Sequence, residues 1–321
     1  MIGTEKKQKA VVIAGPTASG KSSCAVSLCR RTGGAVLSMD SMQIYRRMDI
    51  GTAKVTAAEM QGVPHYLLDI FEPDEPCSIS DFQSAAYKAL ADCEARGLLP
   101  VLAGGTGFYL HAVLYGNDFS EDRGADPKLR GELKTFAMEN GAEALHKKLA
   151  EVDPVSAAAI HPNNIKRVIR AIEYYSQTGE PISSHNESER RREAKLNFAG
   201  FLLSQDREKL YERINRRVDD MREAGLTDEV RKLLCEGVPA DATSMQAIGY
   251  KEIVAYLNGK CTEDEAYEAV KLNSRHYAKR QFTWFKREPG LEEIDIDAYG
   301  RNPETIADYM LKIIREKGIW G

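Results

Sequence analysis

The sequence predicts an α/β fold in which helices cover both faces of a parallel sheet and a helical insertion domain interrupts the chain. Short apolar runs alternate with helical patterns over residues 10–117, which is typical of parallel sheets. A glycine-rich phosphate-binding motif follows the first apolar run. From residue 118 to 197 helical patterns and turn signals replace the strand pattern. We therefore expect a core domain of residues 1–117 and 198–321, with residues 118–197 as the insertion.

Length, charge and cysteine spacing limit the classes of function. The chain has 321 residues, of which 43% are hydrophobic and 29% charged, as in ordinary globular proteins. Its net charge of −4 means that any nucleic-acid site must be a local basic patch. The six cysteines form no C-x-x-C pair, so neither a zinc site nor a disulfide framework is predicted, and we expect a cytoplasmic protein. No apolar run reaches about 18 residues, so we expect no membrane partner.

The phosphate-binding loop follows the apolar residues 10–14. It fits the pattern G-x-x-x-x-G-K-[ST] and consists of Gly15, Pro16, Thr17, Ala18, Ser19, Gly20, Lys21 and Ser22. In such a P-loop, backbone N–H groups surround phosphate oxygens, Lys21 adds a positive charge, and the Ser22 hydroxyl can bind Mg²⁺. A glycine turn without a ligand is the alternative, but the flanking strand and the helical pattern over residues 23–30 favour a di- or triphosphate site.

Polar residues also follow other expected strands. We predict strands at residues 35–39, 65–70, 98–103 and 198–203, and helices at residues 80–96, 207–224, 228–236 and 263–287. Asp40 follows the strand 35–39, and Thr106 lies in the glycine-rich turn after the strand 98–103. Because the carboxyl ends of parallel strands meet at one edge of a sheet, we expect the P-loop, Asp40 and Thr106 to converge on one crevice.

The last long helix has a basic half. It begins with a capping box at residues 262–265, and residues 271–287 contain six Lys or Arg residues and no acid. Lys271, Arg275 and Lys279 recur every four residues and therefore share one face. Two interpretations remain: a solvated basic face with aromatic residues packed beneath it, or an RNA-binding face beside the P-loop crevice.

Taken together, these motifs resemble one family, the bacterial tRNA dimethylallyltransferases, also called tRNA isopentenyltransferases. The matching segments are residues 15–22, 38–45, 48–54, 62–65, 104–107, 161–164, 244–252 and 278–284. The resemblance implies a P-loop sheet like that of NTPases and nucleotide kinases, with a helical insertion. It also implies transfer of the dimethylallyl group from dimethylallyl diphosphate to N6 of the adenine immediately 3′ of a tRNA anticodon, with release of diphosphate.

The resemblance also implies roles for individual residues. Asp40 would act as general base, with Thr106 and Arg217 as further catalytic residues that bind the diphosphate. The P-loop would bind dimethylallyl diphosphate rather than ATP, with Mg²⁺ on Ser22. The tRNA anticodon stem-loop would contact Asp40, Ser41, Met42, Gln43, Thr106, Arg130, Lys166, Arg167, Val168, Ile169, Arg170, Met245, Gln246, Gly249, Arg275, Lys279, Arg280, Gln281 and Trp284. No protein partner is expected.

Several alternatives stay open. Asp40 could cap a helix instead of, or as well as, accepting a proton. The acceptor could be a free adenine nucleotide, although the basic segments favour tRNA; the protein could also be a small-molecule kinase or a nucleotide-governed RNA-binding switch. We expect neither His65 nor His161 to act as an acid or base. Arg47 occupies a position where the family usually has glycine.

Overall fold

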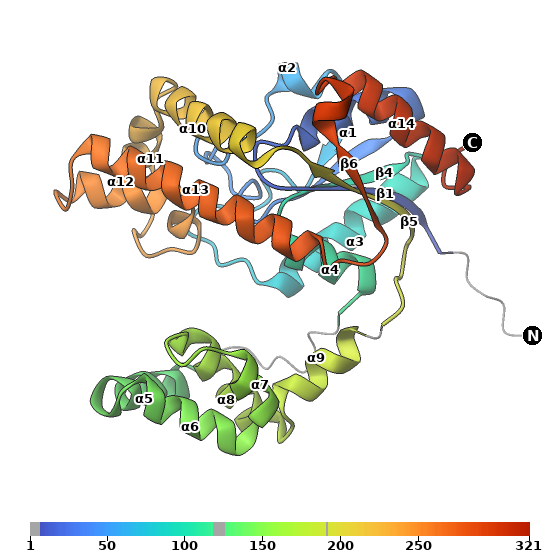
Figure 1. Ribbon diagram of the computed structural model, residues 1–321. Helices are drawn as coiled ribbons and strands as arrows, with labels where there is room; N and C mark the ends of the chain where they lie inside the picture. Colours follow the sequence, from blue (N-terminus) through green and yellow to red (C-terminus); the bar gives the residue numbers. More distant parts are fainter. Residues whose placement is uncertain (1–6, 118–125, 191) are drawn as a thin grey trace, which may run out of the picture. The chain divides into compact units, whose positions relative to one another are not determined.

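The computed structural model describes residues 7–117, 126–190 and 192–321. The chain divides into two compact units (Figure 1): residues 1–116 with 195–321, called here the sheet unit, and residues 117–194, called the helical unit. Among the described residues, the sheet unit contains one parallel sheet of six strands. In spatial order they are β3 (His65–Tyr66), β2 (Ala35–Met39), β4 (Pro100–Gly104), β1 (Lys9–Ala14), β5 (Asn197–Ser204) and β6 (Leu291–Asp295).

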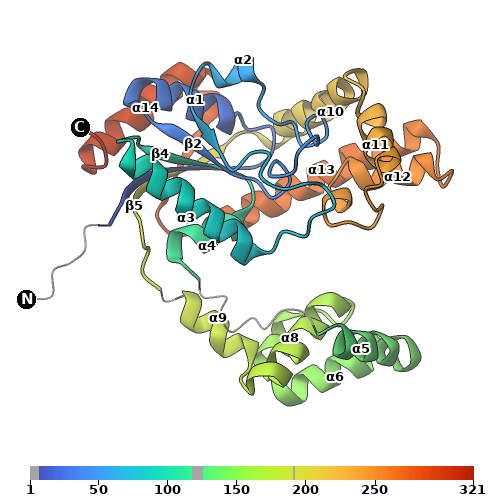
Figure 2. The same cartoon turned by 180° about the vertical axis from the view of Figure 1, so that it is seen from behind.

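Helices cover both faces of this sheet, as Figures 1 and 2 show from opposite sides. On one face, α1 and α14 share a hydrophobic core with Val11 and Ile13 of β1. On the other, α3 and α4 share a core with Val12 and Ala14. A strand that is buried on both sides needs apolar residues throughout, which explains the continuous apolar run in the sequence. The covering helices are α1 (Lys21–Thr32), α14 (Pro303–Glu316), α3 (Ile79–Ala95) and α4 (Gly107–Tyr115).

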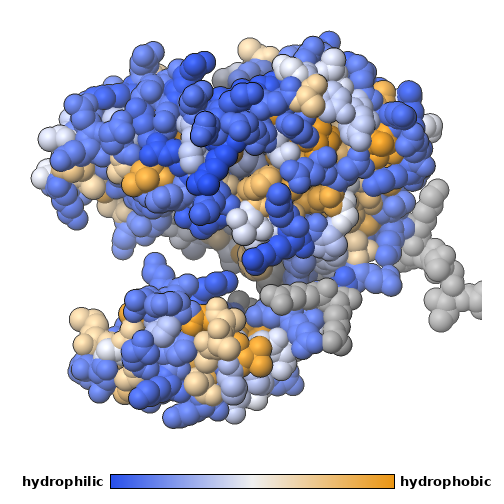
Figure 3. All heavy atoms as spheres, in the orientation of Figure 1, coloured by the Kyte–Doolittle hydropathy of each residue, from blue (hydrophilic) through white to orange (hydrophobic). Residues whose placement is uncertain are grey.

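Four of the remaining helices of the sheet unit pack against one another: α10 (Arg207–Glu223), α11 (Leu226–Cys235), α12 (Tyr250–Leu257) and α13 (Glu263–Phe285). The short α2 (Ala57–Met60) contacts α1 instead, and the 3₁₀ turns are η1 (Ser244–Gln246) and η2 (Ile296–Tyr299). Leu210 and Ile214 of α10 pack on Ala278 of α13. The surface over α10 and α13 is mainly hydrophilic (Figure 3). None of the described helices is both long enough and apolar enough to cross a bilayer.

The predicted helices of the sheet unit agree with the structure to within two residues, but one strand prediction was wrong and one strand was not predicted. The strand expected at residues 65–70 is only His65–Tyr66. Leu67 and Asp69 have φ values of 66° and 55°, and this left-handed backbone cannot continue an extended strand. The sequence analysis also missed β6. It lies at the edge of the sheet and carries three acidic residues, so only Ile294 is buried and no apolar run marks the strand.

The helical unit has its own hydrophobic core. Its helices are α5 (Pro127–Asn140), α6 (Ala142–Val152), α7 (Pro154–Ala159), α8 (Ile165–Thr178) and α9 (Ile182–Arg190). The buried core residues include Leu145, Leu149 and Val168. The insertion was expected to run to residue 197, but the backbone N–H groups of Lys195 and Asn197 already donate to carbonyls of the sheet unit. The structure therefore divides the chain at residues 117 and 194.

A buried carboxylate organises one side of the helical unit. Glu173 of α8 has no exposed surface. Its carboxylate accepts two hydrogen bonds of 2.8 Å from Arg130 of α5, one of 3.1 Å from Arg170, and one of 2.8 Å from the N–H of Asp126. Burial raises the pKa of Glu173, but these donors outweigh it, and the net pKa lies below the usual value. The carboxylate therefore stabilises the unit at neutral pH, and that contribution is lost as pH falls through the lowered pKa.

We expect Glu173→Ala to destabilise the helical unit by about 3 kcal/mol, the lower end of the range for breaking a buried ion pair, because both arginines are partly exposed. Limited proteolysis at increasing denaturant concentration should show cleavage of this variant within residues 126–190 at concentrations where the sheet unit is still folded. Glu143→Ala, an exposed change in the same unit, is the control. Equal stability of the two variants would contradict this account of Glu173.

Candidate functional site

The P-loop connects β1 to α1 and adopts a conformation suited to an anion. Gly20 has a φ of 84° and caps α1 without a side-chain hydrogen bond, which leaves the N–H groups of the first turn available. Lys21 folds back so that its ammonium donates to the carbonyl of Pro16 at 2.7 Å. Burial and the nearby charge of Arg217 lower the pKa of Lys21 to about 7, although Asp40 acts in the opposite direction. The negative charge of a bound phosphate would favour the charged ammonium form of Lys21 and so raise its pKa again.

Helix α10 brings arginines to the same loop. Arg217 donates to the Thr17 hydroxyl at 3.3 Å and to the Ala53 carbonyl at 3.5 Å. Burial lowers the pKa of Arg217, while Asp40 is the largest influence that raises it. Arg213 and Arg216 line the same polar cavity of about 400 Å³ as Lys21 and Ser22. Arg213 and Arg217 lie one turn apart on α10, and Arg216 also reaches the cavity wall.

Asp40 and Thr106 meet at the carboxyl ends of β2 and β4, as expected. The Thr106 hydroxyl accepts from the N–H of Ser41 at 3.1 Å, and the N–H of Thr106 donates to the carbonyl of Met39 at 3.1 Å. Asp40 accepts from the N–H of Met42 at 2.9 Å. This hydrogen bond closes a turn rather than a helix, so the helix-capping interpretation of Asp40 was wrong. Its second carboxylate oxygen is not needed for the turn.

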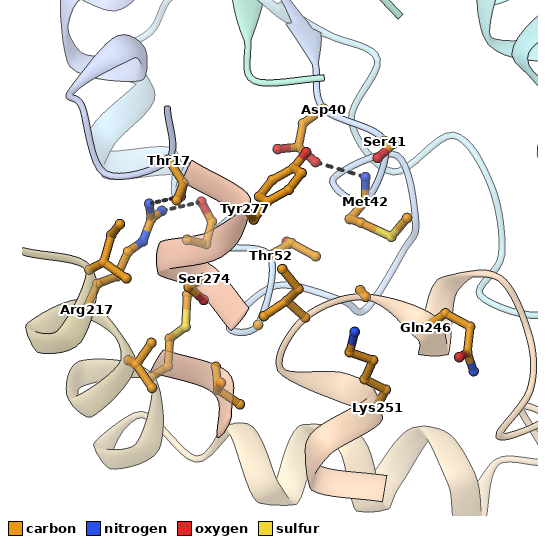
Figure 4. A pocket seen from close by; sticks show the side chains of 18 of the residues that line it. Thr17, Asp40, Ser41, Met42, Thr52, Arg217, Gln246, Lys251, Ser274 and Tyr277 are labelled. Carbon is orange, nitrogen blue, oxygen red and sulfur yellow. Dashed lines mark hydrogen bonds between the residues drawn. The ribbon is translucent and has the colours of Figure 1, made fainter. Parts of the chain in front are cut away.

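The P-loop, the turn after Asp40 and helices α10 and α13 contribute to the lining of a pocket of about 340 Å³ (Figure 4). Thr17, Asp40 and Arg217 lie at one end, and Gln246 and Lys251 lie at the other. Its apolar lining comes from Met42, Ile214, Val218, Met221, Ala247, Ile248 and Val270, and its remaining lining from Ser41, Gly51, Thr52, Ala53, Ser274, Tyr277 and Arg280. The pocket therefore combines a cationic end, a carboxylate and an apolar wall.

Tyr277 was not predicted from the sequence, yet its ring lies beside Asp40 in this pocket (Figure 4). Burial, followed by the charge of Asp40, raises the pKa of Tyr277 to about 12, so its hydroxyl stays protonated at neutral pH. The sequence showed only one aromatic residue among several in the basic half of α13. Its spacing gave no sign of which face would point toward Asp40.

A second carboxylate holds the loop that forms one pocket wall. Glu229 of α11 accepts hydrogen bonds of 2.9, 2.8 and 3.2 Å from the N–H groups of Asp49, Ile50 and Gly51. The Tyr250 hydroxyl donates to the same carboxylate at 2.6 Å. Gly51 leaves no room for a side chain, because a Cβ atom would lie 2.4 Å from the ring of Tyr250. Glu229 was not predicted from the sequence, where it is one acid among several in a charged helix.

The structure separates the residues predicted to bind tRNA into groups. Gln246 and Arg280 line the pocket. The Gln43 amide is used within the protein, donating to the carbonyls of Thr52 at 3.2 Å and Ala53 at 3.3 Å. The residues with buried side chains are Val168, Ile169, Met245 and Gln281. The exposed ones are Lys166, Arg167, Gln246, Lys279 and Arg280.

Others of this set have partners within the protein. Arg275 donates to the side chain of Asn215 at 2.6 Å, and Lys271 on the same face pairs with Asp219 and Glu268. Trp284 packs against Gly107, where a Cβ atom would lie 2.3 Å from the indole. Gly249 has a φ of 100° and caps α12, close to Gly51. The basic face of α13 is thus partly neutralised.

Two other residues singled out from the sequence lie outside the pocket lining. His65 lies 2.9 Å from the carbonyl of Val63, and burial lowers its pKa. Arg47 has a φ of 61°, a conformation that glycine adopts with less strain. Its guanidinium pairs with Glu72 at 2.6 Å and Glu236 at 2.5 Å, and these ion pairs help to offset the backbone cost. His161 is exposed, and its ring accepts from the N–H of Asn163 at 3.2 Å.

Comparison with known proteins gives a consistent result. A family model described as IPP transferase matches residues 43–288, and one described as isopentenyl transferase matches residues 8–71. The chain is 48% identical over 312 residues to a tRNA dimethylallyltransferase of Lachnoclostridium phytofermentans, covering 97% of this chain and 99% of that protein. It is 49% identical over 295 residues to one of Geobacillus kaustophilus, covering 92% of each.

Solved structures agree with the sequence comparisons. The tRNA isopentenylpyrophosphate transferase of Bacillus halodurans has a TM-score of 0.72 and 46% identity, covering 97% of this chain and 98% of that one. A eukaryotic dimethylallyltransferase acting on tRNA has a TM-score of 0.78 and 27% identity, covering 97% of this chain and 80% of that one. The P-loop, the Asp40–Thr106 crevice and these matches over nearly the whole length lead to one conclusion: this chain belongs to the tRNA dimethylallyltransferase family.

Proposed function

We propose that this protein transfers the dimethylallyl group from dimethylallyl diphosphate to N6 of the adenine immediately 3′ of a tRNA anticodon, and releases diphosphate. The observation that carries this proposal is the pocket in which Asp40 lies between a cationic loop and an apolar wall. A hydrolase or kinase site needs no apolar wall beside its phosphate loop. Prenyl transfer needs one, because the donor joins an apolar C5 group to an anion.

The cationic end suits the diphosphate. As the bond between the prenyl carbon and its oxygen breaks, the electron pair stays on the oxygen and negative charge grows on the diphosphate. Lys21 and Arg217 are half-buried close to that position, where reduced hydration strengthens their attraction for the leaving group. The polar cavity beside them, lined also by Arg213 and Arg216, has room for the released diphosphate.

Asp40 suits the acceptor nitrogen. N6 of adenine forms the new bond to the prenyl carbon and must lose one proton, because it would otherwise keep a positive charge. The Asp40 carboxylate, oriented by the N–H of Met42, would accept that proton. Thr106, which follows the neighbouring strand β4, holds this turn by accepting from the N–H of Ser41, and this contact limits the movement of the carboxylate. The adenine must leave its stack to reach this depth.

The residues beside the P-loop also fit Mg²⁺. Ser22 lines the polar cavity together with the carboxylates of Glu59 and Asp220. No group of three or more metal-binding side chains occurs among the described residues. Magnesium bound to phosphates commonly needs only one or two protein oxygens, since phosphate and water supply the rest. When bound there, the ion would add positive charge near the leaving group.

One assay tests the proposed function against the alternatives. The protein is mixed with labelled dimethylallyl diphosphate, Mg²⁺ and either tRNA or AMP. We expect label in tRNA, on the adenine next to the anticodon, and none in AMP. Label in AMP alone, or ATP consumption without prenyl transfer, would contradict the proposal.

We predict that Asp40→Asn lowers the single-turnover rate of transfer at saturating tRNA by about 10² to 10⁴, the usual effect of removing a general base. The amide can still accept from the N–H of Met42, so folding and tRNA affinity within about tenfold of the parent should remain. Asp126→Asn, in which the amide can still cap helix α5, is the control for the same change away from the pocket. If Asp40→Asn transfers the prenyl group at nearly the parental rate, Asp40 is not the general base of the reaction.

Donor binding should take up protons. At pH 8 the Lys21 amine, with its pKa of about 7, is mostly neutral, and a bound diphosphate favours the ammonium form. We therefore expect Lys21 to take up about one proton per donor molecule bound at pH 8. The affinity for dimethylallyl diphosphate should weaken as pH rises above 7. Isothermal titration of dimethylallyl diphosphate in buffers of different ionisation enthalpy measures the uptake.

Lys21→Gln provides the comparison for that titration. It should bind the donor more weakly, take up correspondingly fewer protons, and bind tRNA nearly as the parent does. Because the donor's own ionisation contributes equally to both proteins at a given pH, the difference reports Lys21. Identical proton uptake by parent and variant would show that Lys21 does not change its charge on binding.

The exposed cations Lys166 and Arg167 should contribute electrostatic contacts to tRNA phosphates. Replacing both with Gln should flatten the slope of log Kd against log salt by about 0.7 to 0.9 for each phosphate interaction that the change removes. Filter binding or fluorescence anisotropy over a salt series measures the slope. Lys134→Gln combined with Lys147→Gln removes the same charge from other exposed positions of the helical unit. Equal slopes for the two double variants would assign Lys166 and Arg167 to an ordinary solvated surface.

A further inference from the structure

Gln281 of α13 connects two loops of the site through a single side-chain amide. Its oxygen accepts a hydrogen bond from the N–H of Thr17 at 2.9 Å, and its nitrogen donates to the carbonyl of Gly105 at 2.9 Å. The residue is only 6% exposed. One buried group therefore joins three segments that are far apart in the sequence: α13, the P-loop and the turn after β4.

The surroundings leave the amide little freedom. A Cβ atom at Gly105 would lie 2.1 Å from the Gln281 nitrogen, so the side chain fits against bare backbone. Ala278, one turn earlier on α13, is fully buried against Leu210 and Ile214 of α10. Trp284, one turn later, packs against Gly107. The helix is thus fixed on both sides of Gln281, and the amide cannot move away without disturbing that packing.

Both ends of the amide lead to residues of the proposed reaction. Thr17 also receives a hydrogen bond from Arg217 and lines the pocket beside Asp40. Gly105 precedes Thr106, whose hydroxyl accepts from the N–H of Ser41, the residue next to Asp40. The distance between the cationic loop and the carboxylate therefore depends on two loops that meet at Gln281.

We propose that Gln281 is a positioning residue that sets the P-loop and the Gly104–Gly107 turn in register, so that donor and acceptor lie at reacting distance. The inference rests on the proposed transfer reaction. It replaces the expectation that Gln281 contacts tRNA, because both polar atoms of its amide are already bonded inside the protein. Gln281 acts through Thr17 and Thr106 and does not itself touch the reacting atoms.

Gln281→Glu and Gln281→Met test this role through pH. The charged Glu carboxylate would oppose the Gly105 carbonyl, whereas its protonated form could donate to that carbonyl as the amide does. Met keeps a similar volume but offers no hydrogen bond at any pH. At pH 8 we expect both variants to show a transfer rate about tenfold or more below the parent and a raised KM for dimethylallyl diphosphate, with tRNA Kd within about twofold. On acidification to pH 6, the deficit relative to the parent should shrink for Glu and stay constant for Met.

Gln8→Glu is the matched control. The Gln8 amide donates to the carbonyl of Leu90 at 2.8 Å, a bond of the same kind near the amino end of β1. Gln8→Glu should alter Tm but leave the KM for dimethylallyl diphosphate unchanged. Its transfer rate relative to the parent should not depend on pH. Inorganic diphosphate, titrated calorimetrically into each variant, checks the P-loop independently of transfer and should bind more weakly to both Gln281 variants.

Three results would overturn the inference. The first is transfer by Gln281→Met at the parental rate. This result alone would exclude the positioning role, even if Gln281→Glu does not fold. The second is a fall in tRNA affinity in proportion to transfer, and the third is an equal deficit for the Glu and Met variants at every pH. A parent protein that labels no tRNA would instead refute the proposed function, so the two failures are distinguishable.

Discussion

Two half-buried cations, Lys21 and Arg217, lie close enough across the P-loop for the charge of Arg217 to lower the pKa of Lys21. Burying like charges together is unfavourable unless an opposite charge compensates them. Asp40 supplies part of that compensation from the end of the neighbouring strand, because it raises the pKa of both residues. A diphosphate would supply the rest. These electrostatics support the proposal that the site takes an anionic donor.

Holding these charges in place depends on close contacts at glycine. A Cβ atom at Gly104 would lie 2.2 Å from the carbonyl of Met39, the residue before Asp40. Gly51, Gly105 and Gly107 make similar approaches to Tyr250, Gln281 and Trp284. In each of these three cases the backbone of a loop, or of the first residue of α4, meets a large side chain carried by α12 or α13. The geometry of the reacting groups is thus set by helices that lie late in the chain. Small shifts in the packing of these helices would change the position of Asp40.

The helical unit is organised on a different principle. Its apolar core and the buried Glu173 with its arginines are internal to residues 117–194. Arg130 and Arg170 are held by Glu173, which leaves Lys166 and Arg167 as the more exposed cations of the predicted tRNA-binding segment.

Short local patterns in the sequence determined much of this protein. The P-loop, the apolar runs of β1, β2 and β4, and the residues that follow those strands can be recognised locally, because each depends on backbone conformation or on burial of consecutive residues. The parallel arrangement then predicts that Lys21, Asp40 and Thr106 converge. The edge strand β6 carries too many acids to be recognised, and the left-handed Leu67 that ends β3 leaves no local signal.

Only the tertiary structure decided which side chains complete the site. Glu229, Tyr277 and Gln281 lie in helices whose sequences contain several similar residues, and periodicity does not reveal which of them faces a loop. Gln281 lies 264 residues from Thr17, and Glu229 lies 178 residues from Gly51. Such pairs form because α10–α13 pack over the carboxyl ends of the strands. Hydrogen bonding between those helices and the loops is a property of that packing, which no local segment of the sequence specifies by itself.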